Sequence, residues 1–283
     1  MKHSLLTAAG FLWQRKWGTL GTGAAVLTSA YAVTYAIVEF QESPTNRFQS
    51  TSSSDMYVAY RTHEGIATRE APVVLVHGAP ADASSWNRLL GSEAAKRSDA
   101  RFIAIDRLGY GNSTPGAQLS LEQHAESLLP FIEEGTILVG HSYGGPVVLR
   151  AAAMFADRID GVVIVAGACD PFMKDAQGVR RAVDAIAPIV PEPWEVANRE
   201  LLALTEENRA MEAHLDRIRC PVEVIHGTWD PVCPHDGTVA YLERALPNAD
   251  VNVVSLHRAG HNIHLDHPNE VINAVERIRG GEW

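Results

Sequence analysis

Residues 137–146 read Ile-Leu-Val-Gly-His-Ser-Tyr-Gly-Gly-Pro, an apolar run followed by glycines on both sides of a serine. The apolar start predicts a buried strand, and the glycines that follow predict a tight turn into a helix. Ser142 would stand on that turn with a strained backbone, where bulky neighbours two positions away on either side would collide. Gly140 and Gly144 occupy those two positions. The stretch therefore predicts a strand–serine–helix turn that presents Ser142 as a nucleophile.

Apolar runs typical of buried strands recur on both sides of this turn. Together with the strand before the turn, Ile137–Val139, the predicted strands are Tyr57–Arg61, Val73–Val76, Phe102–Ile105, Val162–Val165, Val222–Ile225 and Val251–Val254. Helical patterns lie between them, over residues 85–97, 121–133, 144–156, 236–245 and 268–279. Because strands that alternate with helices form a parallel sheet covered on both faces, the sequence predicts an α/β fold with a mostly parallel central sheet.

One stretch, residues 171–216, interrupts the alternation. It contains Pro171, Pro188, Pro191 and Pro193, no strand pattern, and two helix-like segments over 174–187 and 194–215. We expect this stretch to be a small helical cap inserted into a single domain that spans residues 55–283.

The N-terminal part, residues 1–54, is expected to lie outside that domain. No charge interrupts the 21 residues from 18 to 38, and about 20 apolar residues cross a bilayer as a helix. The basic residues Lys2, Arg15 and Lys16 precede the run, and the acidic residues Glu39 and Glu42 follow it. This asymmetry predicts a membrane anchor with the remaining chain on the extracytoplasmic side. Residues 41–54 are polar and are expected to be a tether.

Two other interpretations of the N-terminal run stay open. Ala30-Tyr31-Ala32 resembles a cleavage site, and cleavage there would release a secreted protein. Alternatively, the frequent glycine and threonine in the run would suit a poorly inserted or soluble helix.

Composition limits the classes of partner. The chain is 46% hydrophobic, which supports a sizeable packed core, and its formal net charge of −10 argues against nucleic acid as a partner. The three cysteines, Cys169, Cys220 and Cys233, are too few for a disulfide scaffold and match no zinc pattern. Buried thiols are therefore expected, with one optional bridge between Cys169 and Cys233.

A serine hydroxyl needs a base to take its proton and a carboxylate to orient that base. The acid is expected after the nucleophile in the chain, and the base after the acid. Asp230 follows the strand Val222–Ile225 and is the preferred acid, with Asp170 as the backup and Asp236 as a weaker candidate.

The preferred base is His261, which follows a glycine after the last predicted strand and precedes the final helix; His264 is the alternative. Four histidines crowd this region: His257, His261, His264 and His267. The acidic ligands and the spacing of a zincin helix are absent, so we expect no metal and no cofactor.

Two backbone amides are expected to stabilise negative charge that develops on a substrate. The Tyr143 amide lies at the start of the helix after Ser142, and the Ala79 amide lies in the loop after the strand Val73–Val76. The loop 106–113, Asp-Arg-Leu-Gly-Tyr-Gly-Asn-Ser, is expected to shape the edge of the sheet, and His141 to be a buried structural residue.

Taken together, these motifs resemble those of α/β-hydrolase fold enzymes, in the order in which that family carries them. The matching segments are His77-Gly78-Ala79-Pro80, residues 106–113, Gly140 to Gly145, Asp230 and Gly260-His261, and the likeness covers roughly residues 56–283. The resemblance implies Ser142 as nucleophile, Asp230 as acid, His261 as base, and Tyr143 and Ala79 as the oxyanion hole.

The chain departs from some members of that family. Haloalkane dehalogenases and epoxide hydrolases have an aspartate where this chain has Ser142, so their mechanism is not expected here. An N-terminal anchor is not a general feature of the family either.

The expected activity is hydrolysis of an ester or related acyl bond on a small molecule, through an acyl-enzyme intermediate. Apolar residues in residues 171–216, such as Ile186 and Leu201, suit a partly apolar substrate. Carbon–carbon bond hydrolysis, amide hydrolysis and a cofactor-free perhydrolase reaction are alternatives on the same residues. A membrane-anchored binding protein without activity is the alternative from another class.

Overall fold

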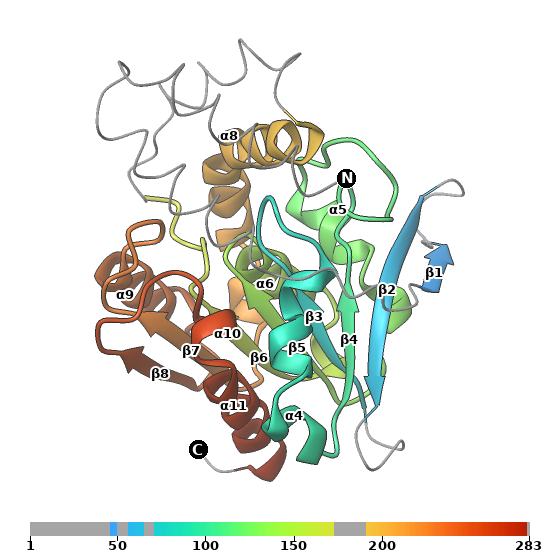
Figure 1. Ribbon diagram of the computed structural model, residues 1–283. Coiled ribbons are helices and arrows are strands. Elements are labelled where there is room, and N and C mark those ends of the chain that lie inside the picture. The colour runs from blue at the N-terminus through green and yellow to red at the C-terminus, as the bar shows by residue number, and fades with distance from the viewer. Residues whose placement is uncertain (1–45, 50–55, 65–70, 173–190, 282–283) are drawn as a thin grey trace, which may run out of the picture. The chain divides into compact units, whose positions relative to one another are not determined.

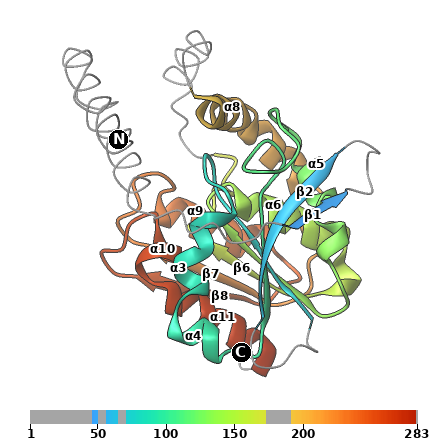
Figure 2. The ribbon, with the colours of Figure 1, turned by 45° about the vertical axis from the view of Figure 1, so that its right-hand side comes forward.

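The computed structural model describes residues 46–49, 56–64, 71–172 and 191–281. All of them belong to one compact unit, which spans Glu42–Trp283. Within the described ranges, one eight-stranded sheet carries helices on both of its faces (Figures 1 and 2). The predicted α/β fold with a mostly parallel central sheet is therefore confirmed.

The strands lie side by side in the order β1-β2-β4-β3-β5-β6-β7-β8. The pairs β1–β2 and β2–β4 are antiparallel, and every pair from β4 to β8 is parallel. All seven predicted strands are present. The bounds are β1 (Asn46–Gln49), β2 (Tyr57–Glu64), β3 (Val73–Val76), β4 (Arg101–Ile105), β5 (Thr136–His141), β6 (Ile159–Val165), β7 (Val222–Gly227) and β8 (Val251–Leu256).

Strand β1 corrects the prediction of a tether over residues 41–54. Asn46–Gln49 pairs with the start of β2, Gln49 opposite Tyr57 and Asn46 opposite Tyr60. An edge strand is held by its backbone hydrogen bonds and needs no run of buried side chains, so its polar sequence gave no strand pattern. The tether prediction is wrong for these four residues.

Eight helices are described. They are α3 (Asn87–Leu90), α4 (Glu93–Arg97), α5 (Leu121–Glu126), α6 (Gly144–Met154), α8 (Glu192–Glu212), α9 (His235–Ala245), α10 (Ile263–Asp266) and α11 (Pro268–Gly280), joined by 3-10 turns η1 (Ala83–Trp86), η2 (Leu129–Phe131), η3 (Ala156–Arg158) and η5 (Leu215–Arg217). The helices predicted over 144–156, 236–245 and 268–279 are present.

Two predicted helices are shorter than expected. The helix predicted over 85–97 is divided into η1, α3 and α4, because the Ser92 side chain accepts a hydrogen bond from the Ala95 amide and so caps a new helix. The helix predicted over 121–133 ends at Glu126, and Pro130 lies in the 3-10 turn that follows.

The two faces of the sheet carry separate cores because side chains alternate along each strand. Val74, Val76, Leu138 and Val224 belong to one core, together with residues of α6, α8 and α9. Their neighbours Val73, Leu75, Ile137 and Ile225 belong to the other, together with residues of α3 and α11. The sheet is therefore buried on both sides, as the continuous Val/Ile/Leu runs predicted.

The predicted cap is described only in part. Its second helix, expected over 194–215, is present as α8, but the first, over 174–187, lies outside the described residues. The run from 18 to 38 lies outside them as well. In the part of the chain that the structure describes, no helix is long and apolar enough to cross a membrane.

Candidate active site

Ser142 lies on the turn between β5 and α6, as predicted. Its φ of 51° is in the left-handed region that favours glycine. A Cβ on Gly140 would press against the carbonyl oxygen of Gly144, and a Cβ on Gly144 would press against that of Val76. Only glycine fits at both positions, so the two glycines allow the sharp turn at Ser142.

Backbone hydrogen bonds hold the strained turn in place. The amide of Ser142 donates to the carbonyl oxygen of Val165 at 3.0 Å, at the end of the neighbouring strand β6. The carbonyl of Ser142 accepts from the amides of Gly145 and Ala168, both at 2.9 Å. Ser142 is therefore fixed to the edge of the sheet at which β5 and β6 end.

The loop after β3 lies directly against the serine. A Cβ on Gly78 would stand 2.8 Å from the Cβ of Ser142, so the glycine allows this close approach. The next amide is that of Ala79, and the Tyr143 amide lies at the start of α6, where the helix dipole is positive. In the described ranges, neither amide donates a hydrogen bond to another residue. The structure thus brings both predicted amides to the neighbourhood of Ser142.

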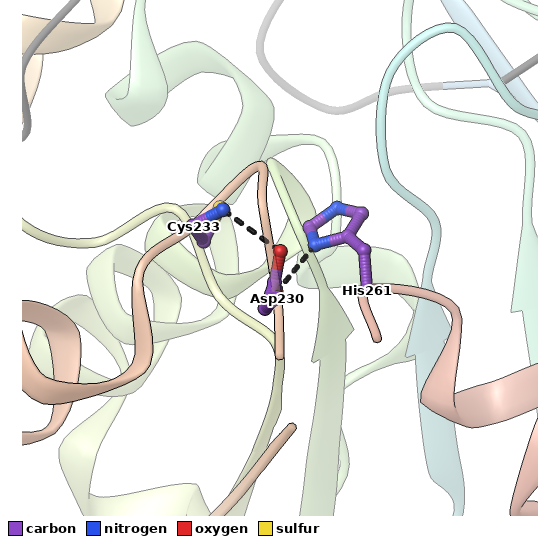
Figure 3. Close-up of side chains that lie close together, drawn as sticks. All are labelled: Asp230, Cys233 and His261. Atoms are coloured by element: carbon purple, nitrogen blue, oxygen red, sulfur yellow. Dashed lines mark hydrogen bonds and ion pairs between the residues drawn. The ribbon is translucent and has the colours of Figure 1, made fainter. Parts of the chain in front are cut away.

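Asp230 follows β7, and its carboxylate is fully engaged. One oxygen accepts hydrogen bonds from the amides of Val232 and Cys233, at 2.8 and 3.0 Å. The other accepts from Nδ1 of His261 at 2.7 Å, as Figure 3 shows. Burial raises the pKa of Asp230, but hydrogen bonds from His226, His261 and the Cys233 amide outweigh burial and hold that pKa well below its ordinary value. The group is therefore an ionised carboxylate.

His261 follows β8 and is buried beside His141, the residue before Ser142. His141 donates from Nε2 to the carbonyl oxygen of His261 at 3.1 Å, and the two rings lie 4.9 Å apart. Since Asp230 binds Nδ1, proton transfer by His261 would use Nε2. The structure brings together Ser142, Asp230 and His261 at one edge of the sheet.

The alternative candidates lie in other surroundings. Asp170 accepts a hydrogen bond from the amide of Phe172, and Asp236 is fully exposed beside His235. His264 packs its ring 4.0 Å from that of His141 and 5.1 Å from that of Trp86. Burial and the neighbouring His261 lower its pKa to about 3, so it stays neutral. None of the three shares the Asp230–His261 arrangement.

Cys233 stands next to Asp230 and His261. Ligand atoms of Asp230, Cys233 and His261 lie within 4.8 Å of one another, which is close enough to hold a metal ion (Figure 3). An ion there would have to replace the hydrogen bond between Asp230 and His261, so we interpret the group as an acid–base pair. All three cysteines are among the described residues, and none forms a disulfide, so the optional bridge between Cys169 and Cys233 is absent.

No sequence pattern indicated the ion pair that is buried near the site. Arg107, in the loop after β4, binds Glu200 of α8, and both side chains are almost completely inaccessible to solvent. The loop 106–113 was expected to shape the edge of the sheet, and nothing in the sequence joined it to a residue 93 positions away.

Comparison with known proteins identifies a family. The model of the family described as "Alpha/beta hydrolase family" matches residues 73–275. The chain is 25% identical over 250 residues to the pimeloyl-[acyl-carrier protein] methyl ester esterase of Serratia marcescens, covering 75% of this chain and 94% of that one. It is 29% identical over 201 residues to the lipase LipV of Mycobacterium tuberculosis, covering 62% and 74%.

Solved structures share the fold. A thermophilic esterase from Thermogutta terrifontis superposes with a TM-score of 0.66 at 22% identity, over 83% of this chain and 97% of that chain.

Proposed function

The chain belongs to the alpha/beta hydrolase family, and from this premise we propose that it is a serine hydrolase that cleaves an ester or a related acyl bond. The observation that carries the proposal is the buried hydrogen bond between Asp230 and His261 beside the strained turn of Ser142. Relatives named as a methyl ester esterase and a lipase support the choice of an ester.

The reaction begins with attack of Ser142 on the substrate carbonyl. Nε2 of His261 takes the hydroxyl proton while the Ser142 oxygen forms a bond to the carbonyl carbon. The carbonyl oxygen becomes an oxyanion, which accepts hydrogen bonds from the amides of Tyr143 and Ala79. The intermediate collapses, the bond to the alcohol oxygen breaks, and His261 returns the proton to the leaving alcohol.

Water completes the cycle. His261 takes a proton from a water molecule as its oxygen attacks the acyl carbon, and the second tetrahedral intermediate expels the Ser142 oxygen, which is reprotonated. The products are a carboxylic acid and the original enzyme. Asp230 orients the ring of His261 throughout and stabilises its positive charge.

Loss of the nucleophile tests the proposal. Ser142→Ala is expected to abolish turnover of a p-nitrophenyl ester and labelling by a fluorophosphonate probe, while the circular dichroism spectrum stays unchanged. Ser92→Ala, which changes a serine that caps α4, is the matched control and should be labelled like the wild type. Near-wild-type turnover by Ser142→Ala would contradict the mechanism.

A substrate panel separates the ester proposal from its alternatives. We expect turnover of esters of varied chain length to exceed that of matched amides and of carbon–carbon substrates. Turnover with hydrogen peroxide in place of water would identify a perhydrolase, and absence of label on folded wild-type protein would favour a binding protein without activity.

For location, we propose that residues 18–38 anchor the chain so that the catalytic domain faces the extracytoplasmic side. The support is the uncharged run itself, with basic residues before it and acidic residues after it. Fractionation of the full chain is the test: recovery in washed membranes supports an anchor, and a shortened protein in the medium supports cleavage near Ala30–Ala32.

A further inference from the structure

We propose that the buried ion pair between Arg107 and Glu200 positions the nucleophile turn and the oxyanion loop, so that α8 is part of the catalytic apparatus. This inference rests on the proposed ester hydrolysis. Arg107 and Glu200 act through other groups and are positioning residues.

Glu200 is a charged residue on the mainly apolar face of α8 that packs against the core. The buried face of α8 includes Ala197, Leu204 and Met211, spaced at helical intervals and packed into the core. Glu200 lies on the same face and is 0% exposed. An apolar residue would pack there without the cost of removing a charge from water. The presence of a carboxylate therefore points to a role in geometry rather than in packing.

Four hydrogen bonds from three residues hold this carboxylate. Arg107 donates from both terminal nitrogens, at 2.8 and 3.1 Å, in the bidentate arrangement that fixes the plane of a guanidinium group. Tyr110 donates its hydroxyl proton at 2.7 Å, and His124 of α5 donates from Nε2 at 3.0 Å. Burial raises the pKa of Glu200, but Arg107 and His124 outweigh burial and keep the group ionised.

With its guanidinium plane fixed, Arg107 contacts both backbone segments that carry the proposed oxyanion-hole amides. Its Nε donates to the carbonyl oxygen of His77 at 3.0 Å. The next residue is Gly78, where an added Cβ would collide with the Cβ of Ser142. The guanidinium carbon of Arg107 lies 4.4 Å from the ring centre of Tyr143, whose amide is the other proposed donor. One side chain therefore holds the two backbone segments that must converge on the oxyanion.

A second polar contact from α8 reaches the nucleophile from another side. Asn208 donates from its side-chain nitrogen to the carbonyl oxygen of Ala168 at 2.9 Å. The amide of Ala168 donates in turn to the carbonyl of Ser142. Both views of the ribbon place α8 at the edge of the sheet where the central parallel strands end (Figures 1 and 2). Ser142 directly follows β5 and therefore lies at that same edge.

The experiment compares two ways of removing the pair in the full chain. Glu200→Gln keeps the shape but leaves Arg107 without its counter-charge. The double variant Arg107→Met with Glu200→Leu replaces both charges with apolar side chains of similar size, which restores packing without restoring the contacts to His77 and Tyr143. Glu206→Gln, an exposed carboxamide substitution on the same helix, is the control.

We expect both variants to lower kcat for a p-nitrophenyl ester by at least about tenfold while KM stays within about twofold, and to slow inactivation by a fluorophosphonate. Assays are made well below the Tm of each variant. The double variant should regain part of the Tm that Glu200→Gln loses, because it removes the unpaired buried charge, although the Tyr110 hydroxyl and His124 still lose their acceptor. Its kcat should stay low, whereas a merely structural pair would let kcat recover together with the Tm. The control should match the wild type.

Three results would overturn the inference: wild-type kcat in a folded variant, a loss that falls mainly on KM, or failure of both variants to fold. Failure of the proposed function is distinct, since the wild type would then show neither turnover nor label.

Discussion

Several histidine rings are buried around the site, but they differ in their partners. His77, His141 and His264 have no carboxylate partner among the described residues, whereas His261 has Asp230. Burial lowers the pKa of His77 and of His141 well below the ordinary value, and that of His264 to about 3. These three rings therefore stay neutral and do not compete for the proton that His261 takes in the proposed reaction.

Neutral buried histidines make stability depend on pH. The folded pKa of His264 is below its unfolded value of about 6.5, so its contribution is fully present above about pH 6.5 and falls by about 1.4 kcal/mol per pH unit toward pH 3. His264→Phe keeps a ring against His141 and Trp86 but removes the titration. Between pH 6.5 and 4, we expect the free energy of unfolding of the wild type to fall more than that of the variant, by up to about 3 kcal/mol. Urea denaturation at several pH values measures this difference; parallel pH profiles would contradict it.

The site shows which residues a sequence can and cannot reveal. Ser142 and its flanking glycines were predictable because the turn is local, and Asp230 and His261 because each follows a strand whose end lies at the same edge of the sheet. The pairing of Arg107 with Glu200 was not predictable, because it depends on how α8 lies over the sheet. No local pattern encodes that placement.

Among the elements, the buried strands were the most predictable, because residues enclosed on both faces form continuous apolar runs. Strand β1 was missed because it is held by backbone pairing and its sequence carries no such run. The division of the region 85–97 depended on one side-chain cap, at Ser92, against an otherwise helical pattern. Local capping and edge pairing therefore account for these two differences.

The packing of α8 gives a prediction for that element. Leu204 is 3% exposed and belongs to the core on its face of the sheet. If α8 unfolds together with the sheet, Leu204→Ala should lower the free energy of unfolding by about 2–5 kcal/mol through the lost contacts and the cavity. Arg209→Ala, at an exposed position of the same helix, should change it by less than about 0.5 kcal/mol. Denaturant unfolding compares the two, and similar small effects would mean that α8 unfolds separately.

At the scale of the whole molecule, the compact unit begins at Glu42 and includes β1. The predicted domain begins at residue 55 and would lack this strand. Two shortened chains, 42–283 and 56–283, contain the same candidate site residues. Without β1, the backbone groups of β2 that face it lose their partners, and such an edge invites association between molecules. We expect 56–283 to have the lower Tm, by about 2–4 °C for each kcal/mol lost, and to aggregate in size-exclusion chromatography. Equal Tm and equal dispersity would show that β1 is dispensable.

The contact between Arg107 and Glu200 also limits how segments can be exchanged among related enzymes. A chimera that received only another enzyme's segment between β6 and β7 would replace α8 and discard Glu200, leaving Arg107 with a buried, uncompensated charge next to the nucleophile turn. With the positioning role proposed above, such a graft is expected to lower kcat. A graft that keeps the ion pair must therefore carry the loop after β4 together with the segment.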